Sequence, residues 1–114
     1  MPFLNIKTNV EIPQNSRESL LKKASQTVAQ ALHKPEQYVM VGAETGLAIM
    51  FAGSTSPAAF AELRALGLPL NKTTELSRLI CDFLHSELKI PRDRIFINFA
   101  DVAGSQWGWN GQTF

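Results

Sequence analysis

Arg94-Ile95-Phe96-Ile97-Asn98-Phe99 is the stretch that decides the fold of this 114-residue chain. Its β-branched and aromatic residues are typical of a strand. Successive side chains of a strand point to opposite faces, so Ile95, Ile97 and Phe99 share one face and Phe96 lies on the other. Apolar residues therefore occupy both faces, as in a strand that is covered on both sides.

Two stretches with apolar residues at the helical period are predicted to cover one of these faces. The first helix is predicted to begin at Asn15, which forms a capping-box pattern with Glu18. The second is predicted to begin at Asn71, which can act as its N-cap. The first ends at His33-Lys34-Pro35 and the second at Ile90-Pro91, because proline disfavours helical geometry in the residue before it. Their apolar positions are Leu20, Leu21, Ala24, Val28, Ala31 and Leu32, and Leu76, Leu79, Ile80, Phe83, Leu84 and Leu88.

The remaining segments predict strands and complete an α/β fold. Residues 57–68 look helical by propensity, but the second half of the chain repeats the order of the first, and this symmetry favours a strand. We therefore expect one domain over residues 1–114, an α+β two-layer sandwich of two β-α-β repeats with a four-stranded mixed sheet and both helices on one face. The other strands are predicted at 3–10, 38–43, 47–52, 94–99 and 107–110, with a turn at 44–46.

The second face of this sheet has no element left to cover it. Val39, Met40 and Val41 also run without alternation, which again indicates burial on both sides. Packing against identical subunits is the simplest way to bury this face, so the sequence predicts an oligomer.

Composition excludes several classes of function. A formal net charge of +1 gives no electrostatic argument for binding nucleic acid or an anionic membrane. Cys81 is the only cysteine, so neither an internal disulfide nor a cysteine-rich metal site is expected. His33 and His85 lack metal-ligand spacing, and His85 is expected to be solvated. The N-terminus lacks a basic region followed by an apolar core, so no secretory signal is expected. The longest apolar stretch, residues 47–53, is too short to span a bilayer, and we expect a cytoplasmic protein.

Pro2 is the candidate reactive residue. We expect Met1 to be removed, because the residue after it is small, which leaves a prolyl secondary amine at the start of an apolar strand. An α-amine has a reference pKa of about 7.7–8.0, and burial lowers it. No carboxylate occurs before Glu11 to raise it. Pro2 is therefore a candidate general base; the alternative, which these two residues alone favour, is that Met-Pro is just the way this chain begins.

Six blocks of residues, taken in order, point to a known family. They are Met1-Pro2, Asn9-Val10, Lys34-Pro35 with Gln37-Tyr38, Gly53-Ser54, residues 94–99 with Asp101, and Gly108-Trp109-Asn110 with Thr113-Phe114. In this order and spacing the chain resembles macrophage migration inhibitory factor and the tautomerase superfamily from end to end. The resemblance implies a homotrimer whose three sheets wrap into a central barrel. It also implies active sites between adjacent subunits and cofactor-free keto–enol tautomerisation of aromatic α-keto acids, typically phenylpyruvate.

The resemblance assigns a role to each candidate site residue. Pro2 is the catalytic base, and Lys34 binds the substrate carboxylate; the alternative for Lys34 is a solvated lysine at a helix C-terminus. Asn98 donates a hydrogen bond to substrate across the subunit boundary, or only satisfies a strand edge. The other substrate-binding positions are Leu66, Phe96, Trp109 and Phe114. Trp107 and Phe3 either belong to the same pocket or serve ordinary core or subunit packing.

Two positions depart from the family pattern. Phe96 stands where the best-known members carry tyrosine, so we expect activity to persist through Pro2 with an altered substrate affinity. Ala58 and Ala61 stand where some members carry a Cys-x-x-Cys pair, so no thiol–disulfide activity is expected there.

Other functions remain open at this point. Family members also act as extracellular signalling ligands, which would make a receptor or host protein the partner and would require export without a signal peptide. The same amino-terminal proline serves decarboxylases and dehalogenases of this superfamily. The sequence does not separate these reactions.

Overall fold

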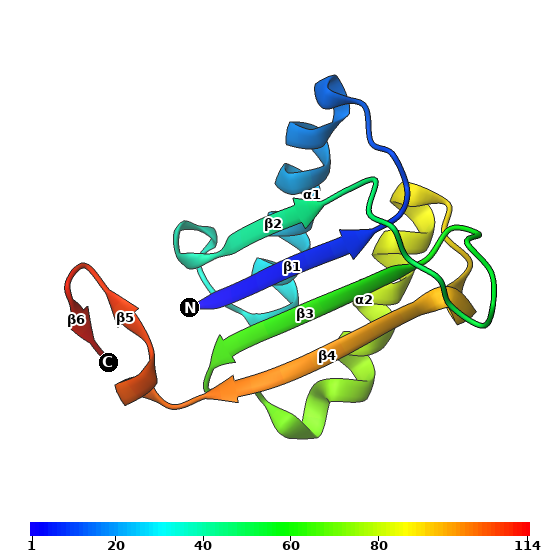
Figure 1. Ribbon diagram of the computed structural model, residues 1–114. Coiled ribbons are helices and arrows are strands. Elements are labelled where there is room, and N and C mark those ends of the chain that lie inside the picture. The colour runs from blue at the N-terminus through cyan, green and yellow to red at the C-terminus, as the bar shows by residue number, and fades with distance from the viewer.

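The computed structural model, which describes residues 1–114, places two helices on one face of a four-stranded mixed sheet (Figure 1). The strand order is β2-β1-β3-β4; β1 pairs parallel with β2 and antiparallel with β3, and β3 pairs parallel with β4. A short hairpin, β5-β6, follows β4. This is the fold class that the sequence predicts. The bounds are β1 Pro2–Thr8, α1 Gln14–Leu32, β2 Met40–Glu44, β3 Ala59–Leu66, α2 Thr73–Leu88, β4 Ile95–Val102, β5 Gly108–Trp109 and β6 Gln112–Thr113.

The core lies between the sheet and the helices. In β1 every second side chain is buried, namely Pro2, Leu4, Ile6 and Thr8. The hydroxyl of Thr8 donates to the Ala58 carbonyl at 2.7 Å and accepts from the Val10 amide, so this buried polar group is satisfied. In β4, Ile95, Ile97 and Phe99 pack against the core while Phe96 on the other face is 56% exposed, which confirms the predicted alternation.

Residues 59–66 form a strand despite their helical propensity. Ala59, Ala61, Leu63 and Ala65 are buried at alternate positions, and they belong to the core cluster that includes residues of both helices. Burial of this alternating face overrides the local preference.

Neither helix begins at its predicted cap. α1 starts at Gln14 after Pro13, and Asn15 makes no capping hydrogen bond. α2 starts at Thr73, and Asn71 lies in a 3-10 turn that Pro69 opens. The carbonyls of Pro13 and Pro69 accept from amides three residues later, Ser16 at 2.9 Å and Lys72 at 3.0 Å. The predicted caps were wrong because these prolines direct the chain into each turn.

Three other predictions needed correction. Residues 47–52 are not a strand, because Ala52 and Gly53 have positive φ and close a tight turn that leaves one bridge, Phe51 to Ser54. The predicted strand at 38–43 begins only at Met40, after a 3-10 turn at Glu36–Tyr38. The predicted strand at 107–110 shortens to β5, because positive φ at Asn110 begins the turn into β6.

Two side chains of α2 also differ from the prediction. Leu79 is 39% exposed rather than part of the buried face. His85 is half-buried, and its Nδ1 donates to the Ile90 carbonyl at 2.8 Å, so it helps to close the helix end instead of being simply solvated.

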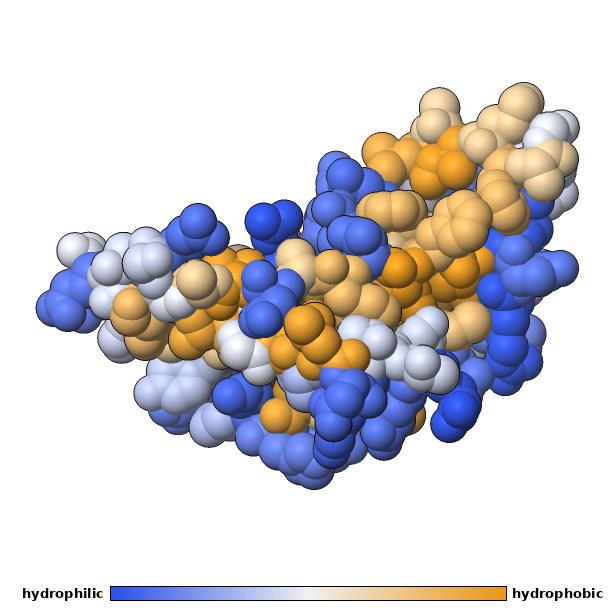
Figure 2. Space-filling model, turned by 90° about the horizontal axis from the view of Figure 1, so that it is seen from below, coloured by the Kyte–Doolittle hydropathy of each residue, from blue (hydrophilic) through white to orange (hydrophobic).

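The sheet face opposite the helices is open. Phe3, Met40, Phe60 and Phe96 lie on it, and no helix of this chain packs on this face; Met40 is 65% exposed. Figure 2, seen from below the view of Figure 1, shows apolar side chains gathered on this side and along the projecting loop between β2 and β3. Neither α1 nor α2 combines the length and the apolar composition needed to cross a bilayer.

Candidate active site

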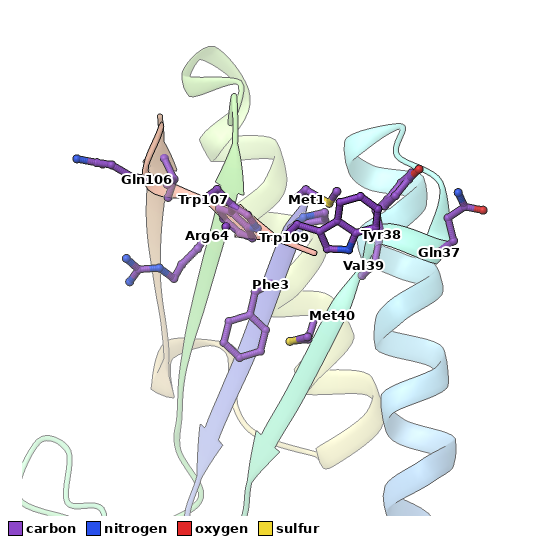
Figure 3. Close-up of a pocket in the computed structure, with 13 residues that line it drawn as sticks. Met1, Phe3, Gln37, Tyr38, Val39, Met40, Arg64, Gln106, Trp107 and Trp109 are labelled. Carbon is purple, nitrogen blue, oxygen red and sulfur yellow. The ribbon is translucent and has the colours of Figure 1, made fainter. Parts of the chain in front are cut away.

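A pocket of about 540 Å³ lies at the beginning of β1 (Figure 3). Pro2, the first residue of this strand, is buried and in register with Ala65 of β3, while the adjacent Phe3 is in register with Met40 of β2. The start of the central strand is thus enclosed by both neighbours. The lining residues are Met1, Pro2, Phe3, Gln37, Tyr38, Val39, Met40, Arg64, Val102, Gln106, Trp107, Gly108 and Trp109.

Aromatic side chains form one wall of this pocket. The Trp109 ring meets the Tyr38 ring edge-on, with centroids 6.4 Å apart, and stacks on the Phe114 ring at 6.3 Å. The Phe114 amide donates to the carbonyls of Gly104 and Trp107, at 3.1 and 3.3 Å. A Cβ on Gly104 would lie 2.8 Å from the Phe114 carbonyl oxygen, so a glycine is needed where the chain end returns. Backbone hydrogen bonds therefore hold the chain end that carries Phe114 next to Trp109.

The amino terminus lies in an electropositive environment. Burial, followed by the positive charge of Lys34, lowers the pKa of the Met1 amine from its usual value of 8.0. Lys34 reaches this position because His33 ends α1 in a left-handed conformation and the Lys34 amide turns back to the Ala29 carbonyl at 3.0 Å.

Met1 occupies part of the pocket and masks Pro2. Its carbonyl oxygen accepts a hydrogen bond from the Leu66 amide at 3.4 Å. While Met1 is attached, the Pro2 nitrogen is an amide and has no basic lone pair.

One chain brings together only part of the predicted site. Pro2 and Trp109 line the pocket with Trp107 and Phe3, whereas Phe114 stacks on Trp109 outside the lining. Lys34 acts on the amine through its charge, and Leu66 reaches Met1 through its backbone amide.

Phe96 and Asn98 lie away from the pocket on β4. Asn98 is in register with Glu62 of β3, which is in register with Asn5 of β1, so two strand spacings separate Asn98 from the central strand. Phe96 instead meets the Phe51 ring at 4.9 Å. In a single chain neither side chain contributes to the pocket around Pro2.

The comparison with protein families identifies the chain. The family model of macrophage migration inhibitory factor matches residues 1–114. This chain belongs to the macrophage migration inhibitory factor family, within the tautomerase superfamily.

Individual family members agree with this assignment over their full lengths. The chain is 43% identical to a macrophage migration inhibitory factor homolog of Brugia malayi, covering 100% of this chain and 99% of the relative. It is 39% identical to macrophage migration inhibitory factor of Meriones unguiculatus, with the same coverage. The crystal structure of a macrophage migration inhibitory factor homologue from Prochlorococcus marinus superposes with a TM-score of 0.91 at 40% identity, covering 98% of both chains.

Several pocket residues of this family member were not predicted as site residues. They are Gln37, Tyr38, Met40, Arg64 and Gln106. Tyr38 belongs to one of the family blocks, and that signal could have found it. Arg64 reaches the pocket because it is in register with Phe3, and strand register is not visible in one sequence. No group of three or more His, Cys, Asp or Glu side chains is placed to hold a metal ion.

Proposed function

We propose that this chain is a cofactor-independent keto–enol tautomerase that acts on α-keto acids carrying an aromatic group, phenylpyruvate being typical. The observation that carries the proposal is the placement of Pro2, buried at the start of the central strand, in a pocket with an aromatic wall. Its family membership supports the same reaction.

Removal of Met1 is the first requirement of the mechanism. It frees the Pro2 nitrogen as a secondary amine, vacates the volume that Met1 fills, and releases the Leu66 amide from the Met1 carbonyl. The Leu66 amide is then a free donor for a substrate oxygen. Lys34 binds the substrate carboxylate, and the aromatic group of the substrate packs against Tyr38 and Trp109.

Pro2 transfers the proton. Its nitrogen takes a proton from the enol oxygen and returns one to the carbon at the far end of the enol double bond, or the reverse, so no net change in oxidation occurs. An amine with the reference pKa of about 8 is already roughly one-tenth unprotonated at neutral pH, so any lowering of its pKa gains at most about tenfold. Correct placement of a general base contributes about 10²–10⁴-fold. Placement of Pro2 therefore matters more than the tuning of its pKa.

The working enzyme is proposed to be a homotrimer. The open sheet face carries Phe60 and Phe96, which are 38% and 56% exposed in one chain, and both favour burial by another subunit. Asn98 and Phe96 of one subunit would complete the pocket that contains Pro2 of the next, which explains why one chain does not bring them together.

Intact-mass measurement combined with a phenylpyruvate assay tests the proposal. We expect a protein without Met1 to be active, and Pro2→Gly, also without Met1, to lose at least about 10²-fold in kcat/KM because the placed base is lost. Pro91→Gly, at an exposed proline before β4, is the matched control and should keep its activity. Full turnover by a protein that retains Met1 would overturn the mechanism.

A further inference from the structure

Arg64 is the only side chain with a formal charge among the 13 residues that line the pocket. It lies on the open face of β3, is exposed, and makes no ion pair or side-chain hydrogen bond; the ion pairs join Lys7 to Glu62, Lys23 to Glu87 and Arg92 to Asp82. The nearest acid on the same face of β3, Glu62, is thus engaged by Lys7 at 3.3 Å. The Arg64 guanidinium is therefore uncompensated within this chain.

Arg64 and Lys34 lie on opposite sides of the amino terminus. Arg64 belongs to β3 and is in register with Phe3, while Lys34 follows α1 and precedes β2 on the other side of β1. In Figure 3, Arg64 and Tyr38, which follows Lys34 by four residues, lie on opposite sides of Met1. No carboxylate lines the space between them. A cation therefore lies on each side of the amino terminus, with Arg64 in the pocket lining and Lys34 outside it.

We propose that Arg64 is a specificity-determining residue that selects aromatic α-keto acids carrying a second carboxylate. This inference rests on the tautomerase function proposed above. With Lys34 holding the carboxylate next to the keto group, a substrate with one charge leaves Arg64 without a partner. A guanidinium presents a planar pair of donors that matches a carboxylate, which a lysine ammonium does not. The amide of Gln106, which lines the pocket with Arg64, supplies a further donor.

Binding of unreactive probes tests Arg64 separately from catalysis. Cinnamate carries one carboxylate and 4-carboxycinnamate carries two, and neither can be tautomerised. We expect calorimetric titration of the Met1-free protein to show about fivefold tighter binding of 4-carboxycinnamate, which corresponds to about 1 kcal/mol. Arg64→Met should abolish this preference and leave cinnamate affinity unchanged within about twofold, and Arg64→Lys should keep part of it. Arg78→Met, which removes an exposed arginine on α2, is the matched control and should keep all of it.

Two results would overturn the assignment. One is equal affinity of the wild-type protein for the two probes; the other is an equal loss of affinity for both probes in Arg64→Met. Turnover of phenylpyruvate and 4-carboxyphenylpyruvate is measured on the same samples. A preference for 4-carboxycinnamate without turnover of either keto acid would contradict the proposed tautomerase function and still support Arg64 as the carboxylate-binding residue.

Discussion

Lys34 affects the amino terminus through its charge although it does not line the pocket. A positive charge destabilises the ammonium form, so it adds to burial in lowering the pKa of the Met1 amine. The same two causes are expected to act on the Pro2 amine once Met1 is removed. Only the unprotonated amine can act as a base, so the pKa fixes the pH below which activity is lost.

The variant Lys34→Met is expected to shift the acidic limb of the pH–kcat/KM profile to higher pH. Loss of the positive charge raises the pKa of the amine, so a larger fraction is protonated at a given pH and activity disappears sooner on acidification. The variant also loses substrate affinity at every pH, but this changes the height of the profile and not its midpoint. Lys22→Met, at an exposed lysine on α1, should leave the midpoint in place. An unmoved midpoint in Lys34→Met would contradict the electrostatic role.

The site could be predicted from sequence only as far as its residues belong to short local patterns. Pro2 and Trp109 stand in such blocks, and the structure places both at the pocket. Arg64 stands in a segment that looks helical, and only the pairing of β3 with β1 brings it next to Phe3. Pairing between distant strands depends on the whole chain, so no local signal could identify Arg64.

At the scale of elements, Arg94 fixes the loop between β2 and β3. Its guanidinium donates to the carbonyls of Phe51, Ser54, Ser56 and Pro57, at 3.0–3.1 Å, and lies 5.2 Å from the centre of the Phe51 ring. The Phe51 ring in turn meets Phe96. One side chain at the start of β4 thus stabilises a loop about 40 residues earlier in the chain.

We expect Arg94→Met to lower the free energy of unfolding by about 2 kcal/mol, because several hydrogen bonds to a charged group are lost and two of them are partly buried. Urea denaturation measures the loss. Arg78→Met removes an arginine that makes no side-chain hydrogen bond or ion pair, so its free energy of unfolding should stay within about 0.5 kcal/mol of wild type. A loss of that small size in Arg94→Met would mean that the loop is held by other contacts.

This loop also shows why its secondary structure was predicted wrongly. Residues 47–52 are apolar, which suggested a strand, but Met50 is 68% exposed and the segment has no partner strand in its own chain. A strand needs a second strand to pair with, and apolar composition shows only the tendency to form a strand, not whether such a partner exists. By contrast, Ile95, Ile97 and Phe99 lie next to β3 and pack against the core under the helices. Their alternation was therefore sufficient to predict the strand.

The C-terminal hairpin positions Trp109. Its turn residues, Asn110 and Gly111, have φ of 53° and 77°, the combination that a tight two-residue hairpin turn requires. This Asn-Gly pair is a sequence signal for a hairpin, yet only one strand was predicted here. A Cβ on Gly111 would meet nothing within 4 Å, so the cost of an alanine there comes only from the positive φ of the backbone and not from a steric clash.

Gly111→Ala is expected to loosen the hairpin and change the environment of Trp109. The left-handed conformation costs a non-glycine residue about 1–2 kcal/mol, and two-residue strands have little pairing energy to offset it. We expect a red shift of tryptophan emission and weaker near-ultraviolet circular dichroism. Gly53→Ala is the matched control, because Gly53 also has positive φ and open space but lies far from both tryptophans in the sequence. It should leave the tryptophan signals unchanged; equal spectral changes in both variants would exclude a specific role for the hairpin.

At the scale of the whole molecule, the separation of Pro2 from Asn98 predicts that each site is shared between subunits. Pro2 lies on the central strand β1 and Asn98 on the edge strand β4, and only Pro2 lines the pocket of its own chain. If a neighbouring subunit supplies Asn98, then a subunit that lacks one of these residues can still contribute the other.

Mixing two impaired variants tests this sharing. Pro2→Gly and Asn98→Ala should each have low activity as homotrimers, because every site lacks one of the two residues. When they are co-expressed in equal amounts, random assembly in a closed ring places an intact Pro2 beside an intact Asn98 at about one quarter of the sites, so activity should recover to about that fraction of wild type. Co-expression of Pro2→Gly with Pro2→Gly/Asn98→Ala, which leaves no intact Pro2, should recover nothing. Activity of the first mixture that stays at the mean of the two parent variants, in trimers confirmed by light scattering, would show that each site is built within one subunit.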